Sequence, residues 1–198
     1  MSPAASKQKK IAITLAIGGA LVFIVSALLL AAIIIARVFY LQPYIIPTNG
    51  MYPGKPANTR AIALRHPYNS ISQIKKGDVI VFKQIHDGRS SFIISRVIAL
   101  PGDTFSQLPS GELKVANKTL PLTKIRREEE LIIFLESNLG TKYEVAYESK
   151  RTKPAESPTE ITIGKNELLL IGDNRDHSYD SRGYGPVPFS SITGKVIW

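Results

Sequence analysis

The residues best suited to do chemistry lie in three short segments of the 198-residue chain. The last of these, GDNRDHSYDSRGYGPV (Gly172–Val187), holds four Asp or Asn, two Arg, two Ser and three Gly. Asp–Arg pairing and side-chain hydrogen bonds to the backbone would brace such a loop. A solvated, charge-rich turn is the alternative. The density of turn formers directly after the apolar run Leu168–Ile171 favours a rigid functional wall.

The other two segments are IPTNGMYPG (Ile46–Gly54) and FIISRVIALPGD (Phe92–Asp103). In the first, two prolines bracket a polar turn and a methionine, a layout typical of a loop that holds one reactive side chain. Thr48, Asn49 and Gly50 nevertheless offer no evident nucleophile in working order. The purpose of this loop is therefore the main question that the sequence raises.

A membrane anchor precedes all three segments. Ile11–Ala36 is 26 residues without a charge, and as a helix it would be about 39 Å long, enough to cross a bilayer core of about 30 Å. A cleaved signal peptide has an apolar stretch of only about 7–15 residues, so we expect a retained anchor. Lysines precede the run, at Lys7, Lys9 and Lys10, and the positive-inside rule places the N-terminus in the cytoplasm. The predicted organisation is a cytoplasmic segment 1–10, a transmembrane helix 11–36 and an extracytoplasmic domain 37–198.

The part after the anchor is expected to be mainly β. Short apolar runs recur between turn signals such as Gly77-Asp78, Pro101-Gly102-Asp103 and Gly172-Asp173. The predicted strands are Ala61–Leu64, Val79–Phe82, Phe92–Leu100, Leu131–Leu135, Glu167–Ile171 and Ile192–Trp198, with a half-buried strand through Tyr143, Val145 and Tyr147. Arg126–Asn138 is the nearest helical candidate, but its apolar residues bunch together. Residues 149–160 (SKRTKPAESPTE) are expected to form a solvated loop.

Composition excludes several classes of function. The chain has no cysteine, which excludes disulfides, thiolate zinc sites and cysteine catalysis. The formal net charge of +9 suits contact with anionic membrane lipid, but the basic pair Arg126-Arg127 is followed at once by Glu128–Glu130, so no basic stripe for nucleic acid forms. The histidines, at 66, 86 and 177, lack metal-ligand spacing. No cofactor, no metal and no nucleic acid are expected.

The three segments, in this order behind an anchor, resemble the type I signal peptidase (leader peptidase) family of membrane-bound serine proteases. Gly172–Asp176, with Ser178 and Asp180-Ser181-Arg182, is similar to the family's last motif almost letter for letter. Arg96–Ile98 with Leu100–Asp103 resembles the lysine-bearing segment, Gly77–Phe82 the Gly-Asp strand, and Pro43 to Pro53 the nucleophile loop. The resemblance implies a signal-peptidase-like β domain with a smaller, variable β subdomain at about 104–165, where the match lapses.

The same resemblance implies that both catalytic positions are substituted. The family's serine nucleophile falls on Gly50 and its lysine base on Ser95. The family's oxyanion hole corresponds to the Gly50 N–H and the Thr48 hydroxyl, and its site-bracing residues correspond to Ser178, Asp180 and Arg182. Substrate-contacting positions would be Pro47, Met51 and Ile94. No catalytic residue is therefore assigned.

The favoured hypothesis is a catalytically inactive homologue in the bacterial inner membrane. It would bind or regulate signal-peptide-bearing preproteins, or an active signal peptidase paralogue. Two alternatives remain open. One is a working peptidase with a relocated nucleophile or base, with Thr48, Ser95, Lys55 and His177 as the candidates. The other is a structural component of an envelope complex.

Overall fold

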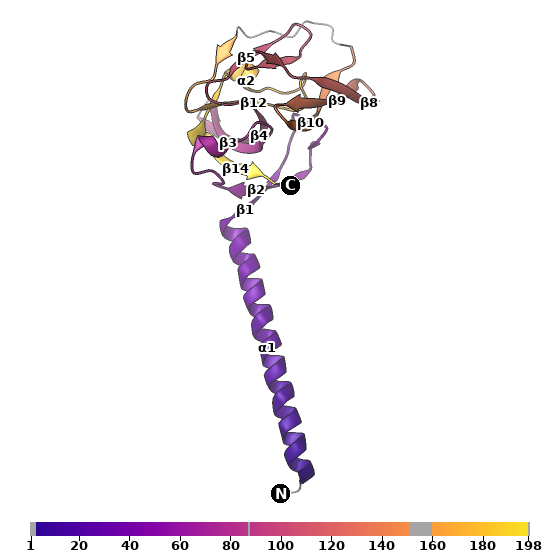
Figure 1. Cartoon of the computed structure of the whole chain (residues 1–198), viewed down its shortest axis with the longest axis vertical. Coiled ribbons are helices and arrows are strands. Elements are labelled where there is room, and N and C mark those ends of the chain that lie inside the picture. Colours follow the sequence, from indigo (N-terminus) through magenta and orange to yellow (C-terminus); the bar gives the residue numbers. More distant parts are fainter. Residues whose placement is uncertain (1–2, 87, 151–159, 198) are drawn as a thin grey trace. The chain divides into compact units, whose positions relative to one another are not determined.

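The computed structural model describes residues 3–86, 88–150 and 160–197 (Figure 1). It separates into two compact units, Met1–Leu41 and Gln42–Trp198. The first unit is dominated by one helix, and the second holds all the chemistry that the sequence suggested.

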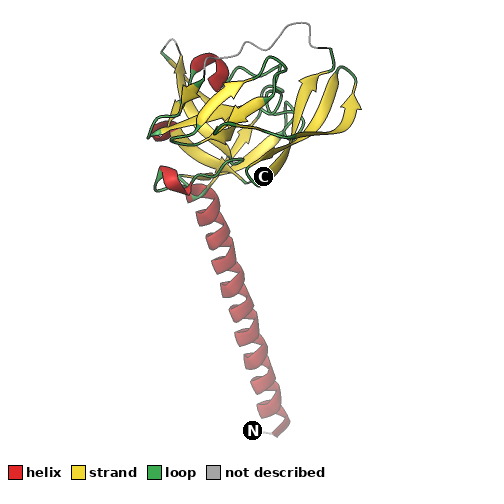
Figure 2. Ribbon diagram, turned by 45° about the horizontal axis from the view of Figure 1, so that its top comes forward, coloured by secondary structure: helices red, strands yellow, loops and turns green. Residues whose placement is uncertain are grey.

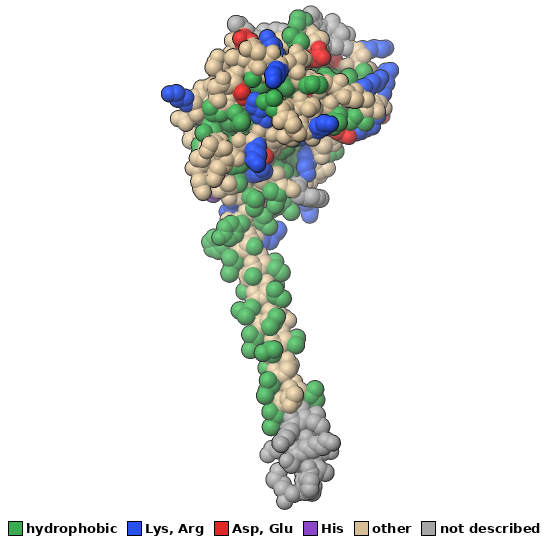
Figure 3. Space-filling view, in the orientation of Figure 1, with side chains coloured by type: hydrophobic (Ala, Val, Ile, Leu, Met, Phe, Trp, Pro, Cys, Tyr) green, Lys and Arg blue, Asp and Glu red, His purple; other side chains and the backbone are tan. Residues whose placement is uncertain are grey.

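Helix α1 (Pro3–Phe39) contains the predicted anchor. Its segment Ile13–Phe39 has a mean hydropathy of 2.9, is not buried against the rest of the chain, and is long and apolar enough to cross a membrane. In the face seen in Figure 3 its described surface is almost wholly hydrophobic. The expectation of an N-terminal apolar helix is confirmed, and the helix continues beyond the uncharged run at both ends.

The second unit is mainly β, as expected (Figure 2). Its largest sheet has the strand order β1-β2-β14-β3-β4-β12-β13. These strands are β1 (Leu41–Ile45), β2 (Arg60–Arg65), β14 (Ile192–Val196), β3 (Val79–His86), β4 (Arg89–Ala99), β12 (Glu167–Ile171) and β13 (Val187–Pro188). The pairs from β2 to β13 are antiparallel. Strand β1 therefore lies at one edge of the sheet.

The middle of the chain forms two smaller sheets, of order β10-β9-β8 and β11-β5-β6-β7. Their strands are β5 (Thr104–Gln107), β6 (Leu113–Val115), β7 (Lys118–Thr119), β8 (Leu122–Glu128), β9 (Leu131–Asn138), β10 (Thr141–Glu148) and β11 (Ile161–Thr162). The remaining helices are short: η1 (Ile71–Gln73), α2 (Ser181–Tyr184) and η2 (Phe189–Ser191). The helical alternative for Arg126–Asn138 is wrong, because these residues form the end of β8 and all of β9.

Strand β12 joins the two hydrophobic cores of this unit. Leu169 and Ile171 belong to a core shared with the middle of the chain, whereas Leu168 and Leu170 face the other core, with Phe82. Because successive residues of a strand point to opposite faces, a strand buried on both faces must be a continuous apolar run. This double burial fixes the end of β12 firmly, and the Gly172–Val187 segment begins there.

The other predicted strands are confirmed with small changes at their ends. The one expected at Ile192–Trp198 ends at Val196, and the one expected at Phe92–Leu100 begins three residues earlier and ends at Ala99. Strands β1, β5–β8, β11 and β13 were missed, since most are short and lack an apolar run. Most of the loop predicted at 149–160 falls on residues 151–159, which lie outside the described residues.

Candidate functional site

The loop after β1 is held in place by its own backbone. Ile46 is buried; its N–H donates to the Thr59 carbonyl at 3.0 Å, and its carbonyl accepts from the Asn58 N–H at 2.7 Å. Met51 is buried too, and its carbonyl accepts from the Lys55 N–H at 2.8 Å. The buried side chains of Ile46 and Met51 hold both ends of the polar turn, so residues 48–50 have a fixed conformation.

Gly50 lies against the Gly172–Val187 segment. Its carbonyl accepts a hydrogen bond from the Asn174 N–H at 3.0 Å, and its own N–H donates to the Thr48 hydroxyl oxygen at 3.4 Å. A Cβ added at Gly50 would lie 3.6 Å from Thr48 Oγ1 and 3.7 Å from Ser178 Oγ. These are ordinary van der Waals contacts, so the site has room for a side chain that the sequence does not supply.

Gly172 is a contrasting case, because no side chain fits there. A Cβ at this position would come within 2.1 Å of Ser178 Oγ and 2.5 Å of the Gly50 carbonyl oxygen. The glycine therefore allows Ser178 and the Gly50 loop to approach the end of β12 closely.

Ser95 lies on β4, opposite Ile80 of β3. It is 2% exposed, and its hydroxyl has no hydrogen-bond partner among the described residues. A buried polar group without a partner costs about 1–3 kcal/mol. Such orphaned groups call for an explanation, and one explanation is a ligand.

A groove of about 450 Å³ joins these elements. The predicted site residues that line it are Pro47, Thr48, Gly50, Met51, Ile94, Ser95 and Ser178. Sequence reasoning missed the walls formed by Tyr44, Ile45, Phe92 and Tyr179. The segment 41–45 (LQPYI) has no polar–apolar alternation that could have marked the first two. The groove is thus mainly apolar, and its lining includes the hydroxyl-bearing residues Thr48, Ser95 and Ser178.

Asp180 and Arg182 lie behind the groove rather than in its lining. The Asp180 carboxylate accepts two hydrogen bonds from the Arg182 guanidinium, both at 2.8 Å, and one from the Gly172 N–H at 3.0 Å. Charge-assisted pairs of this kind are stronger than neutral hydrogen bonds. They tie the two ends of the 172–182 loop together.

A second ion pair lies directly beside Ser95. Arg96 donates to the Asp173 carboxylate at 2.7 and 2.6 Å and to the Gly77 carbonyl at 2.7 Å. Its guanidinium also stacks 4.2 Å from the ring centre of Tyr143. Burial, the largest single influence, would lower the pKa of Arg96, but the charge of Asp173 and its hydrogen bonds act together against burial and the pKa is raised. This pair joins β4 to the end of β12, and the sequence analysis did not include it among the bracing residues.

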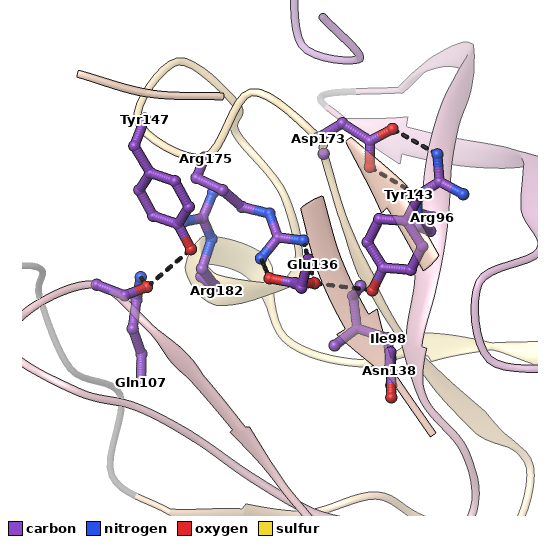
Figure 4. Close-up of polar contacts among 12 residues, drawn as sticks. Arg96, Ile98, Gln107, Glu136, Asn138, Tyr143, Tyr147, Asp173, Arg175 and Arg182 are labelled. Carbon is purple, nitrogen blue, oxygen red and sulfur yellow. Dashed lines mark hydrogen bonds and ion pairs between the residues drawn. The ribbon is translucent and has the colours of Figure 1, made fainter. Parts of the chain in front are cut away.

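A third bracing pair reaches into the middle of the chain (Figure 4). Arg175 donates to both carboxylate oxygens of Glu136 on β9, each at 2.7 Å, and the Tyr143 hydroxyl donates to the same carboxylate at 2.8 Å. Asn138 on β9 donates to the Ile98 carbonyl of β4 at 2.9 Å. The small β10-β9-β8 sheet therefore supports the site from behind.

The candidate replacement catalytic groups are placed as follows. The His177 Nε2 atom lies 3.3 Å from a Glu148 carboxylate oxygen, at the rim of the groove. Lys55 has an interaction partner and is not among the residues that line the groove. Within the described ranges, no base hydrogen-bonds to the Ser95 hydroxyl, and no group of three or more potential metal ligands is found.

Among the described residues, the groove shows no nucleophile paired with a base at the positions of Gly50 and Ser95. An activated nucleophile needs a side chain and a base within about 2.6–3.2 Å of each other. Gly50 provides no side chain, and Ser95 is neither a base nor in contact with one. The walls and the bracing ion pairs are nevertheless complete.

Comparison with known proteins gives a consistent result. A family model described as signal peptidase, peptidase S26, matches residues 17–198. Signal peptidase IB of Staphylococcus aureus is 27% identical over 158 residues, which cover 80% of this chain and 76% of that protein. Signal peptidase I of Leptolyngbya laminosa is 29% identical over 172 residues, covering 81% of this chain and 69% of the other.

A crystal structure of a signal peptidase I from Enterococcus faecalis aligns with 64% of this chain and 98% of its own, at 21% identity and a TM-score of 0.38.

Proposed function

The chain belongs to the signal peptidase family, peptidase S26, and from this premise we propose that it is a non-catalytic member that binds signal-peptide-bearing exported proteins. The N-terminal apolar helix and the relatives fit a membrane-anchored protein. In the proposed organisation, 1–10 is cytoplasmic, 11–36 spans the membrane and 37–198 is extracytoplasmic, with 104–165 as the variable subdomain. This orientation follows from the lysines that precede the helix.

The observation that carries the proposal is the combination of Gly50 and Ser95 in one formed groove. Both positions line the same cavity. Loss of one member of a cooperative catalytic set costs about 10⁶ in turnover, and loss of the second adds little. The Gly50 N–H and the Thr48 hydroxyl would retain part of an oxyanion hole, which by itself sustains only a small fraction of the rate.

Binding needs neither missing group. Strand β1 is the edge of the large sheet, and Tyr44 and Ile45 at its end line the groove. An extended peptide can add to such an edge through backbone hydrogen bonds, while shallow pockets select its side chains. The orphaned Ser95 hydroxyl would then find its partner in the bound chain.

The experiment compares the full-length protein in detergent micelles with the double variant Gly50→Ser, Ser95→Lys. Fluorescence anisotropy measures binding of a labelled preprotein, and gel electrophoresis measures its cleavage. Gly50→Ala, Ser95→Ala is the matched control, because it also fills position 50 but has no nucleophile or base. We expect the native protein to bind without cleaving, the double variant to cleave, and the control to remain inactive.

Two results would overturn the proposal. Cleavage by the native protein would show a relocated nucleophile, to be sought first at Thr48, Ser95 and Lys55. If the native protein neither bound preproteins nor co-purified with an active signal peptidase, a binding role would be excluded. A structural role in an envelope complex would then be favoured.

A further inference from the structure

A second cavity, of about 660 Å³, is lined in part by the same loop that carries Gly50. Its lining includes Asn49, Glu128, Glu129, Glu130, Asn174 and His177. His177 also lines the apolar groove, and Asn49 is the neighbour of Gly50. The two cavities therefore adjoin at His177 and at the Gly50 loop, within reach of one bound chain.

The cavity is acidic in a basic protein. Three glutamates line it, and among the residues that the structure describes no lysine or arginine does, although the whole chain carries a formal charge of +9. Glu128 is already engaged by Tyr52 and Arg126. Glu129 and Glu130 are both exposed. In the described part of the chain, neither of their carboxylates shows a hydrogen bond or an ion pair, so both are open to a cation.

A buried acceptor in the same lining also lacks a donor. Asn174 is 3% exposed and its Oδ1 has no partner among the described residues. The assignment of its amide is fixed, because the other terminal atom, Nδ2, donates to the Asn49 carbonyl at 3.2 Å. The residues that line the cavity thus include three acceptor groups without a donor among the described residues, namely Asn174 Oδ1 and the carboxylates of Glu129 and Glu130. A lysine ammonium or an arginine guanidinium carries only donors and is their chemical complement.

Arg126 and Arg127, the arginines next to Glu128, do not fill this role. Arg126 is directed to Glu128 and Glu144. The Arg127 guanidinium donates to the Glu129 backbone carbonyl at 3.3 Å and to the Ser149 hydroxyl at 3.4 Å. In these contacts neither arginine bonds to the carboxylate of Glu129 or Glu130.

We propose that this acidic cavity binds a lysine or arginine side chain of the polypeptide held in the apolar groove. It would select chains with a basic residue next to the segment that lies over Gly50. The inference rests on the proposed peptide-binding function and adds a charge preference to it. Glu129 and Glu130 are its specificity-determining residues.

The test measures anisotropy of labelled peptides with the full-length protein in uncharged detergent micelles. Each peptide has the same small, apolar central segment. Lys-Lys, Gln-Gln or Glu-Glu is placed on one flank or the other. The protein variants are wild type, Glu129→Gln/Glu130→Gln, and Glu129→Lys/Glu130→Lys. Glu112→Gln/Glu160→Gln is the matched control, because it removes the same charge at residues that do not line the cavity.

On one flank, we expect Lys-Lys to bind about 3- to 10-fold more tightly than Gln-Gln, since each exposed charge pair contributes up to about fivefold. The preference should disappear in the Gln variant, reverse toward Glu-Glu in the Lys variant, persist in the control, and weaken at 0.5 M salt.

The outcomes separate the two proposals. If no peptide binds, the binding function itself fails, and this inference fails with it. If peptides bind equally whatever the flanking charge, the binding function stands and the basic preference is wrong. A preference that survives in the Glu129→Gln/Glu130→Gln variant would also overturn the inference, because another surface would then be its source.

Discussion

Arg175 and Glu136 form a bidentate ion pair, and their side chains are 0% and 1% exposed. Arg175 belongs to the last sequence motif, whereas Glu136 lies on β9 in the middle of the chain. The charge of Glu136 raises the pKa of Arg175 against the opposing effect of burial. The pair therefore joins the Gly172–Val187 segment to the middle of the chain, the region for which the sequence supported the fewest predictions.

Glu136→Gln should destabilise the protein strongly. Removing one partner of a buried pair leaves an uncompensated charge and costs about 3–5 kcal/mol. We expect a loss of this size in the free energy of unfolding, measured by urea denaturation of the full-length protein in micelles. Arg126→Gln is the control, because its ion pairs are partly exposed and should contribute much less to stability than the buried pair.

A second variant tests whether charge is the cause. Glu136→Leu with Arg175→Met removes both charges and keeps apolar volume, so it should be more stable than Glu136→Gln. If Glu136→Gln alone cost no more than the Arg126 control, the bracing role of this pair would be wrong.

The long-range partners could not be read from the sequence. The run Gly172–Val187 shows that Arg175 needs an acceptor, but it does not show that Glu136, 39 positions away, provides it. The pairing of Arg96 with Asp173 was hidden for the same reason, because 77 positions separate them. Local pairing of Asp180 with Arg182 was predictable because only one residue separates them.

The two glycines of the site should respond oppositely to alanine. Gly172→Ala would force its methyl group to within 2.1 Å of Ser178 Oγ and 2.5 Å of the Gly50 carbonyl. Overpacking of this kind costs about 1–3 kcal/mol. Gly50→Ala makes only ordinary contacts and should be neutral or slightly stabilising, since alanine restricts the unfolded chain more than glycine does.

Thermal denaturation of the two variants checks this prediction, with peptide anisotropy as a second readout. Gly172→Ala should also weaken peptide binding, because its methyl group must displace Ser178 or the Gly50 loop. Equal stability of Gly172→Ala and wild type would contradict the close packing seen at the end of β12.

The Ser95 hydroxyl should destabilise the protein when no peptide is bound. Ser95→Ala removes an orphaned buried hydroxyl and should raise the free energy of unfolding by about 0.5–1 kcal/mol. Ser181→Ala is the matched control. Its buried hydroxyl accepts from the Leu170 N–H at 3.1 Å, so removing it should cost about 1–3 kcal/mol.

Peptide affinity separates a ligand contact from a simple packing defect. If Ser95 bonds to the bound chain, Ser95→Ala should be more stable yet bind peptide about 2- to 10-fold more weakly. Unchanged affinity would remove Ser95 from the binding site and leave the orphaned hydroxyl without a functional explanation.

The sequence predicted the motif residues of the groove better than its aromatic lining. Thr48, Gly50 and Ser95 stood at positions marked by local motifs, and the fold brings them into one groove. Tyr44, Phe92 and Tyr179 escaped notice because an exposed aromatic residue carries no signal until the fold places several around one hollow. Likewise, the acidic cavity depends on the β8–β9 turn lying beside the Gly50 loop, which only tertiary structure determines.

The contact between Tyr52 and Glu128 should make stability depend on pH in the acid range. The Tyr52 hydroxyl and then the Arg126 guanidinium hold the pKa of the Glu128 carboxyl below its ordinary 4.5. A depressed pKa in the folded state contributes stability above the ordinary value, and the contribution is lost as the pH falls through the folded-state value. Glu128→Gln should therefore lower the melting temperature at pH 7, and its difference from wild type should shrink below about pH 4.5.

Tyr52→Phe provides the control for this prediction, because it keeps the Arg126 ion pair and removes only the hydroxyl. It should give a smaller difference with the same direction of pH dependence. Calorimetric melting temperatures between pH 3 and pH 8 measure both. A difference that stays constant across this range, or grows toward low pH, would show that the ionised Glu128 carboxylate does not stabilise the contact between the Gly50 loop and the β8–β9 turn.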